Sequence, residues 1–390
     1  MDFDLSPDQV ELRGAAADLL DGLASPERLR SFVGPGTGRL EARAPAAGAG
    51  APASAGDGFD RLLWERMADQ GWLAVERPEG EGGLGLGLVE VAVLCEELGR
   101  HAAPAPFVGS ILCLGALDEA AEDDSLAPRT REDAAGWTAR LATGEAVGCV
   151  AWSADRHAVT ARSGDGWWWL SGCPEPTQYA SVADVAVVMA DDGLFAVPLD
   201  EGGRPPAEPA MDPTRPLAWL RMDEVRAHRI GDAGGASRLL ERAATTAAAQ
   251  LLGASARVLE MSVEYAKVRR QFGRPIGSFQ AVKHRLADAL VDVEGMRSST
   301  YYAAWCLATG DPEGGLAASM AKAWCSDSSR RVTSAGLQVH GGIGFTWDHE
   351  LHLYLKRAQL DAVSFGTAAW HRDRIAGMLA QRLSEGRTPI

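Results

Sequence analysis

The chain has 390 residues, of which 46% are hydrophobic and 23% are charged, and this composition is that of a globular protein long enough for two or three packed units. The formal net charge of −15 disfavours a nucleic-acid partner, because a polyanion is repelled on average. No apolar run approaches the roughly 20 residues that a membrane span needs, so no membrane partner is expected.

The cysteines and the first residues bear on the compartment. The six cysteines (Cys95, Cys113, Cys149, Cys173, Cys306 and Cys325) are scattered and show no C-x-x-C spacing. Residues 1–5 are acidic and lack a signal-peptide pattern. We therefore expect reduced thiols, no metal site and a cytoplasmic protein.

The first third of the chain has helical patterning. Apolar residues recur at helical spacing over 8–23, and similar patterns cover 59–70 and 88–98. Residues 34–58 are rich in Gly, Ala, Pro and Ser, and they offer too little apolar surface to offset the entropy of ordering. The sequence predicts a helical N-terminal domain over 1–147 with a mobile loop at 34–58.

The residue pattern changes from helical to β-forming near Gly148. Short runs rich in β-forming residues follow, and clusters of Gly, Asp and Pro such as 163–166 and 191–193 separate them. This pattern predicts a small β-barrel or β-sandwich over 148–228.

Helical patterning returns after the middle region. It covers 239–270, 280–307, 316–340 and 360–383, which predicts an antiparallel four-helix bundle over 236–390. The order of helices, strands and helices indicates an α+β protein. No G-x-G-x-x-G lies between a strand and a helix, which argues against a Rossmann-type nucleotide site.

Two glycine-rich segments stand about 65 residues apart. Residues 269–280 read Arg-Arg-Gln-Phe-Gly-Arg-Pro-Ile-Gly-Ser-Phe-Gln, and residues 338–345 read Gln-Val-His-Gly-Gly-Ile-Gly-Phe. Together with the order of elements, the pair resembles the FAD-contacting motifs of the acyl-CoA dehydrogenase family over nearly the whole chain. The resemblance implies the fold of that family: an N-terminal helical domain, a middle β domain and a C-terminal four-helix bundle.

The resemblance also implies an activity and a set of cofactor contacts. Family members are FAD-dependent, usually tetrameric, and remove hydrogens from the α and β carbons of an acyl-CoA thioester. A guanidinium is suited to paired contacts with a pyrophosphate, and glycines let backbone amides approach phosphate oxygens. The residues that match are Arg269, Gln271, Phe272, Gln338, Gly341, Gly342 and Thr367. The alternative for Arg269 and Arg270 is that they are solvated cations at a helix end.

The catalytic position departs from the family pattern. Where the family usually carries its catalytic glutamate, this chain has Phe365, which cannot accept a proton. The stretches that usually touch the flavin, here 151–156 and 176–179, also differ, and only Ser153 and Thr177 offer hydroxyl groups there.

Other bases are weak candidates. In some family members the base lies on the helix before Arg-x-x-Phe-Gly, and the matching position here is Ala243. Glu241 is two residues away, about 200° round a helix, so it would not point to the same place. His371 and Asp373, which follow the lost glutamate, are weaker still. The catalytic residue stays unassigned.

Three functions remain open from the sequence. The chain resembles the non-catalytic subunit of actinobacterial heterotetrameric (α2β2) acyl-CoA dehydrogenases, which completes the FAD site of a catalytic partner subunit in lipid or steroid catabolism. Alternatively, it is a self-sufficient flavoenzyme, as a homotetramer, with a relocated base or different flavin chemistry. A third alternative is a flavin-free scaffold protein. For the first two, the resemblance implies an acyl-CoA substrate and an electron-acceptor protein.

Overall fold

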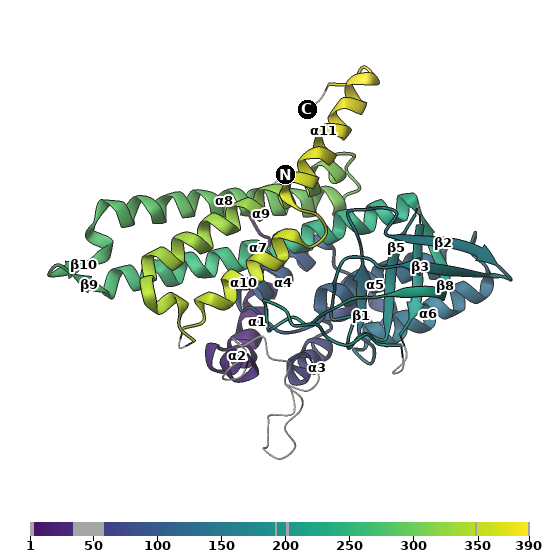
Figure 1. Ribbon diagram of the computed structural model, residues 1–390, viewed down its shortest axis with the longest axis horizontal. Coiled ribbons are helices and arrows are strands. Elements are labelled where there is room, and N and C mark those ends of the chain that lie inside the picture. The colour runs from purple at the N-terminus through teal and green to yellow at the C-terminus, as the bar shows by residue number, and fades with distance from the viewer. Residues whose placement is uncertain (1–3, 34–57, 192, 200–202, 348, 389–390) are drawn as a thin grey trace, which may run out of the picture. The chain divides into compact units, whose positions relative to one another are not determined.

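The computed structural model describes residues 4–33, 58–191, 193–199, 203–347 and 349–388 (Figure 1). Apart from Gly58, the predicted mobile loop at 34–58 lies outside the described residues. The predicted order of helices, then strands, then helices is confirmed. Among the described residues, no helix combines the length and the apolar character needed to cross a bilayer.

The chain forms two compact units. Unit 1 comprises Met1–Arg30, Gly87–Ala103 and Ala244–Ile390, and unit 2 comprises Ser31–Leu86 and Pro104–Ala243. Sequence patterns alone do not reveal this division, because unit 1 is assembled from three separate stretches of chain.

Unit 2 packs helices against a mixed β structure. Its helices are α3 (Arg61–Asp69), α5 (Phe107–Glu122) and α6 (Pro128–Ala142), with short 3-10 turns at Trp72–Ala74 and Glu79–Glu81. Its strands are β1 (Gly148–Ala151), β2 (Val159–Gly164), β3 (Trp167–Gly172), β4 (Thr177–Gln178), β5 (Val185–Ala190), β6 (Gly193–Pro198), β7 (Leu217–Ala218) and β8 (Met222–Asp232). The main sheet has the order β1-β5-β6-β8-β3-β2, and β4 pairs with β7.

Strand β8 links two sets of strands. Its first half pairs antiparallel with β3, from Met222 to Ala227, and its second half pairs with β6, from His228 to Asp232. A strand shared in this way is typical of β-sandwiches in which a long strand passes from one sheet to the other. Strand β5 is buried along most of its length, which places the core of the unit at β1, β5 and β6.

Unit 1 is helical. It contains α1 (Pro7–Leu23), α4 (Leu88–Arg100), the part of α7 (Ala233–Val268) from Ala244 onward, α8 (Gln280–Ala308), α9 (Gly314–His340), α10 (Leu351–Val363) and α11 (Ala368–Ser384). Helix α2 (Pro26–Val33) spans the boundary between the units. A capping box formed by Ser6 and Gln9 starts α1. Helices α4 and α7 approach closely at Gly99 and Gly253, where any side chain would collide with the backbone of the other helix.

Two predicted helix boundaries are wrong. The single helix expected over 360–383 is interrupted between α10 and α11, because Phe365 (φ +55°) and Gly366 (φ +105°) adopt left-handed backbone conformations and Thr367 caps α11. Helix α7 begins at Ala233, before the expected start, since the Asp232 carboxylate accepts a hydrogen bond from the Gly235 amide.

Candidate functional site

The first glycine-rich segment forms a β-hairpin at the end of α7. Strands β9 (Arg270–Gln271) and β10 (Arg274–Pro275) pair antiparallel, and both turn residues, Phe272 (φ +51°) and Gly273 (φ +80°), have positive φ. Positive φ at both positions is typical of a tight type I′ hairpin turn. The turn leaves the Phe272 side chain 92% exposed. Its ring meets Phe279 edge-on, with 6.1 Å between ring centres.

The second glycine-rich segment lies against the base of this hairpin. The ring of His340, the last residue of α9, stacks on Tyr265 near the end of α7 with 4.6 Å between ring centres. A side chain at Gly336 would collide with Val258, so α7 and α9 pack closely at these two residues. The sequence predicts both motifs but not their meeting, which these contacts establish.

The glycines of the second segment are open to solvent. Gly341 ends α9 with φ +64° and ψ −141°, a conformation that glycine adopts readily. Gly342 has no positive φ, and a Cβ atom added there would meet nothing within 4 Å. The described part of the chain therefore offers no packing reason for glycine at position 342, whereas close approach of an outside group to the backbone would require it.

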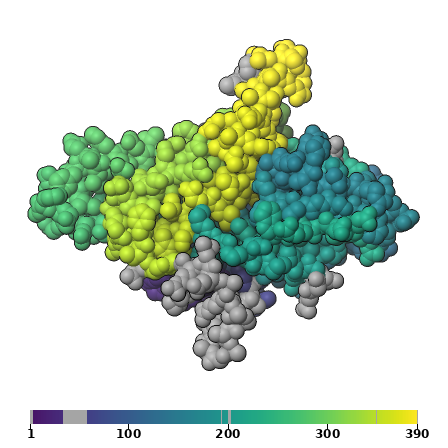
Figure 2. Space-filling view, in the orientation of Figure 1, coloured from purple at the N-terminus to yellow at the C-terminus, as the bar shows by residue number. Residues whose placement is uncertain are grey.

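We call Arg269, Gln271, Phe272, Gln338, Gly341 and Gly342 the hairpin surface, and all six are exposed. Figure 2 shows the green hairpin segment at the surface of the molecule. Within the described residues no carboxylate pairs with the guanidinium of Arg269 or of Arg270. Free guanidinium groups beside exposed glycine amides fit the pyrophosphate of FAD. Arg269 also follows the end of α7, so the alternative of a helix-end cation fits its position.

The position of the missing base lies in the turn between α10 and α11. Residues 364–367 form this turn, which we call the pinned turn. The carbonyl oxygen of Phe365 accepts a hydrogen bond from His371 Nε2 at 2.9 Å, and that of Gly366 accepts one from Lys322 Nζ at 2.9 Å. A side chain at Gly366 would collide with Trp370 and His371. The Thr367 hydroxyl accepts a hydrogen bond from the Trp370 amide.

Lys322 is a fully buried cation that the sequence did not single out. Besides the Gly366 carbonyl, its ammonium donates to the Ala362 carbonyl at 3.2 Å and to the Ser326 hydroxyl at 3.0 Å. Burial lowers the pKa of Lys322 to about 8, while Asp361 opposes this shift. Lys322 therefore holds the end of α10 and the pinned turn together from α9.

The other predicted base candidates have structural surroundings. His371 is 1% exposed, and burial, reinforced by Lys322, lowers its pKa to about 3. Asp373 is exposed on α11, and the half-buried Glu241 accepts a hydrogen bond from Ser237 at 3.0 Å within α7. None of these contacts prepares a carboxylate or imidazole for proton abstraction.

Both hydroxyl groups expected near the flavin form contacts within unit 2. Ser153 accepts a hydrogen bond from the Asp155 amide, and the buried Thr177 donates to the Glu175 carbonyl at 3.1 Å. The residue before Ser153, Trp152, is only 7% exposed.

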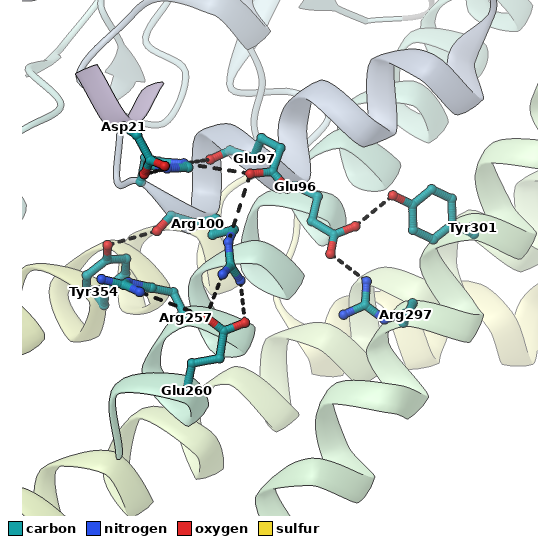
Figure 3. A network of polar contacts seen from close by, with 10 residues as sticks. Asp21, Glu96, Glu97, Arg100, Arg257, Glu260, Arg297, Tyr301 and Tyr354 are labelled. Carbon is teal, nitrogen blue, oxygen red and sulfur yellow. Dashed lines mark hydrogen bonds and ion pairs between the residues drawn. The ribbon is translucent and has the colours of Figure 1, made fainter. Parts of the chain in front are cut away.

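One perturbed carboxyl group escaped sequence reasoning. Glu97 on α4 is buried, and this burial, opposed by Arg100 and reinforced by Glu96, raises its pKa to about 7. Figure 3 shows Glu97 facing Arg100, and Glu96 facing Arg297 and Tyr301. A raised pKa is typical of catalytic acids and bases, but Glu97 belongs to a network of charged side chains that links α4 with α7 and α8. No group of three or more His, Cys, Asp or Glu in the described residues could hold a metal ion.

Comparisons with known proteins agree with this arrangement. The model of the acyl-CoA dehydrogenase C-terminal domain matches residues 235–380, and that of the N-terminal domain matches residues 42–125. Acyl-CoA dehydrogenase IpdE2 of Mycobacterium tuberculosis is 36% identical over 302 residues, which cover 77% of this chain and 81% of the relative.

Solved structures extend the likeness to the fold. The ChsE4–ChsE5 complex from Mycobacterium tuberculosis is similar with a TM-score of 0.83 and 28% identity, over 98% of this chain and 99% of the matched one. The Tcur3481–Tcur3483 steroid ACAD variant is similar with a TM-score of 0.81 and 27% identity, over 97% and 99%. Two matching domain models and a relative of this identity are decisive: the chain belongs to the acyl-CoA dehydrogenase family, whose members are FAD-dependent oxidoreductases acting on CH–CH bonds.

Proposed function

We propose that this chain serves the α,β-dehydrogenation of an acyl-CoA thioester as the subunit that completes the FAD site of a homologous catalytic partner. One contrast carries the proposal. The hairpin surface keeps the exposed, unpaired guanidinium of Arg269 and glycine amides that suit a pyrophosphate, while Phe365 occupies the position of the base.

Each residue has a role in this proposal. Arg269 binds phosphate oxygens, and the amides at Gly341 and Gly342 accept close approach of the same group. Thr367, exposed on the pinned turn, is a further cofactor contact. When bound, FAD supplies the two-electron oxidant of the dehydrogenation. Because Phe365 cannot take a proton, the partner subunit provides the base that removes the α proton.

The comparisons support the class of assembly and of substrate. ChsE4–ChsE5 is a complex of two named chains, and Tcur3481–Tcur3483 is named a steroid ACAD. We therefore infer an α2β2 heterotetramer that acts on a steroid-derived acyl-CoA and passes its electrons to an acceptor protein. None of the six cysteines forms a disulfide, which supports a reducing, cytoplasmic location.

Co-expression tests the proposal. The chain is produced alone and together with a homologue that carries glutamate at the position of Phe365, and flavin absorbance per protomer and sedimentation are measured. We expect flavin and dehydrogenase activity only in the mixed complex. An active, flavin-bound homotetramer formed by this chain alone would favour the self-sufficient enzyme, and a stable flavin-free monomer that ignores the partner would favour the scaffold.

The self-sufficient alternative requires another base within reach of the substrate. Glu241, its best candidate in the sequence, is hydrogen-bonded to Ser237 on its own helix. No observation on its side chain favours this role over that of a helix carboxylate.

A further inference from the structure

A cavity of about 530 Å³ lies in unit 2 between helices α5 and α6 and strands β3, β6 and β8. Figure 1 shows α6 beside β8 in this unit. Small-molecule sites commonly have volumes of about 300–1,000 Å³, so the cavity has room for an organic ligand. None of its lining residues belongs to the hairpin surface or to the pinned turn.

Part of the cavity lining is apolar. Leu117, Ala134, Trp137, Val225 and Ile230 line it from both helices and from β8. A wall of this kind favours a ligand with an apolar body, because burial of such a body releases water from both surfaces.

Two arginines converge on one tryptophan at the cavity. The guanidinium carbon of Arg226 lies 4.2 Å from the centre of the Trp167 ring, and that of Arg129 lies 4.4 Å from it. Stacking uses the face of a guanidinium and leaves the N–H groups in its plane available as donors. Both guanidinium groups therefore lie within 4.4 Å of the centre of the same ring, at the lining of the cavity.

The carboxylates nearby do not neutralise both cations. Among the described residues, Arg226 has no carboxylate within ion-pair distance, and Arg129 has only a long contact of 3.9 Å with Asp133. Asp133 instead lies 3.1 Å from His228 Nε2. The two arginines and one carboxylate leave a local positive charge in a chain whose net charge is −15.

The pKa of His228 is affected by the same charged groups. Its ring meets the Trp167 ring edge-on with 4.6 Å between centres. Burial lowers the pKa of His228; Asp133 opposes this shift, while Arg129 and Arg226 reinforce it. A bound anion would act on the pKa of His228 in the direction opposite to the two arginines.

We propose that this cavity binds an amphipathic organic anion, with its carboxylate held by Arg129 and Arg226 and its apolar body packed against Trp137 and Ile230. Charge complementarity selects the head group, and the apolar part of the lining selects the body. The site shares no lining residue with the proposed cofactor surface, and its existence does not depend on the proposed function.

Calorimetry with octanoate and 1-octanol tests the proposal, because the two probes share an alkyl chain and differ in charge. We expect the full chain, alone or in its complex, to bind one octanoate per protomer at least about tenfold more tightly than 1-octanol. Arg226→Met should weaken octanoate binding about tenfold or more, since it removes charge-assisted hydrogen bonds. Arg226→Lys keeps the charge but not the planar donors, so its affinity for octanoate should lie between those of the wild type and of Arg226→Met.

Arg162→Met is the matched control. Arg162 is an exposed arginine on β2 that pairs with Glu224 at 3.1 Å, outside the cavity lining, so its loss should leave octanoate binding unchanged. Equal affinity for the two probes, no saturable octanoate binding, or equal losses in Arg226→Met and Arg162→Met would each overturn the proposal. If Arg226→Met lowers the melting temperature, Arg129→Met, a change at a side chain that is 70% exposed, decides the question by the same criteria.

Discussion

The hairpin surface and the pinned turn both carry family motifs, but the chain holds them in opposite ways. The hairpin surface presents Phe272 at 92% exposure, the unpaired guanidinium of Arg269, and a glycine at 342 that the described chain does not require. In the pinned turn, Lys322 and His371 hold two consecutive carbonyl groups from inside unit 1. The hairpin surface keeps residues that suit an outside ligand. The pinned turn keeps its backbone conformation although the base of the family is absent.

This difference separates two reasons for keeping a motif. Positive φ at Phe365 costs on the order of 1 kcal/mol or more for a non-glycine residue, so surrounding contacts must hold the turn in place. Those contacts preserve the backbone shape around Thr367 whichever side chain stands at 365. We infer that the turn serves cofactor contact and not proton transfer, and the following variants test that separation.

The largest effect is expected from Arg269→Ala. Loss of charge-assisted hydrogen bonds to the pyrophosphate should weaken FAD binding about 10- to 100-fold, because each such bond contributes roughly 1.5–3 kcal/mol. Flavin absorbance per protomer after gel filtration, and FAD titration of the stripped protein, measure the change. Arg66→Ala is the control, since Arg66 is an exposed arginine on α3 in a surface ion pair with Asp69. Unchanged flavin content in Arg269→Ala would assign Arg269 to the helix end alone.

Lys322→Met should have the next largest effect. The variant leaves the carbonyl groups of Ala362 and Gly366 without their buried donor, although it also removes the cost of burying a charge. We expect a lower melting temperature and a loss of FAD affinity on the order of tenfold, as the pinned turn loosens. Lys283→Met, at an exposed position on α8, should change neither quantity. If FAD affinity stays the same while the protein is destabilised, the turn has no part in holding the cofactor.

Glu97→Gln tests whether the raised pKa of Glu97 affects only the stability of the protein or also its catalytic activity. The folded pKa of about 7 exceeds the ordinary value of 4.5, so the contribution of Glu97 to wild-type stability is fully present below about pH 4.5 and is lost as the pH rises through 7. The variant should therefore gain on the order of 1–3 kcal/mol of stability at pH 8 and little at pH 4.5. Thermal unfolding at the two pH values measures this gain, and dehydrogenase activity of the assembled complex should persist. Loss of activity with intact flavin would make Glu97 a rival for the base.

Sequence reasoning reached the order of elements, the family and the cofactor because these depend on local patterns and on two specific motifs. It missed the break between α10 and α11, since the apolar periodicity continues through a turn whose conformation depends on Lys322, about 40 residues earlier in the chain. It missed Glu97 and the cavity beside Trp167 for the same reason. Burial and convergence of side chains arise from tertiary packing, and neither produces a periodic pattern in the amino-acid sequence.

Glu241→Gln should have the smallest effect. Glu241 accepts a hydrogen bond from Ser237 on its own helix, and a glutamine oxygen can accept the same bond, so the fold should be unaffected. A general base must lie within hydrogen-bond reach of the proton that it removes, and such a base contributes about 10²–10⁴-fold to the rate. If the base comes from the partner subunit, the activity of the assembled complex should therefore change less than about twofold, a limit far below any catalytic contribution of this kind. Steady-state rates of the co-expressed complex, with flavin content and sedimentation as controls, measure the outcome. A hundredfold loss with both controls intact would make Glu241 the base, and the self-sufficient enzyme would replace the partner subunit as the function of this chain.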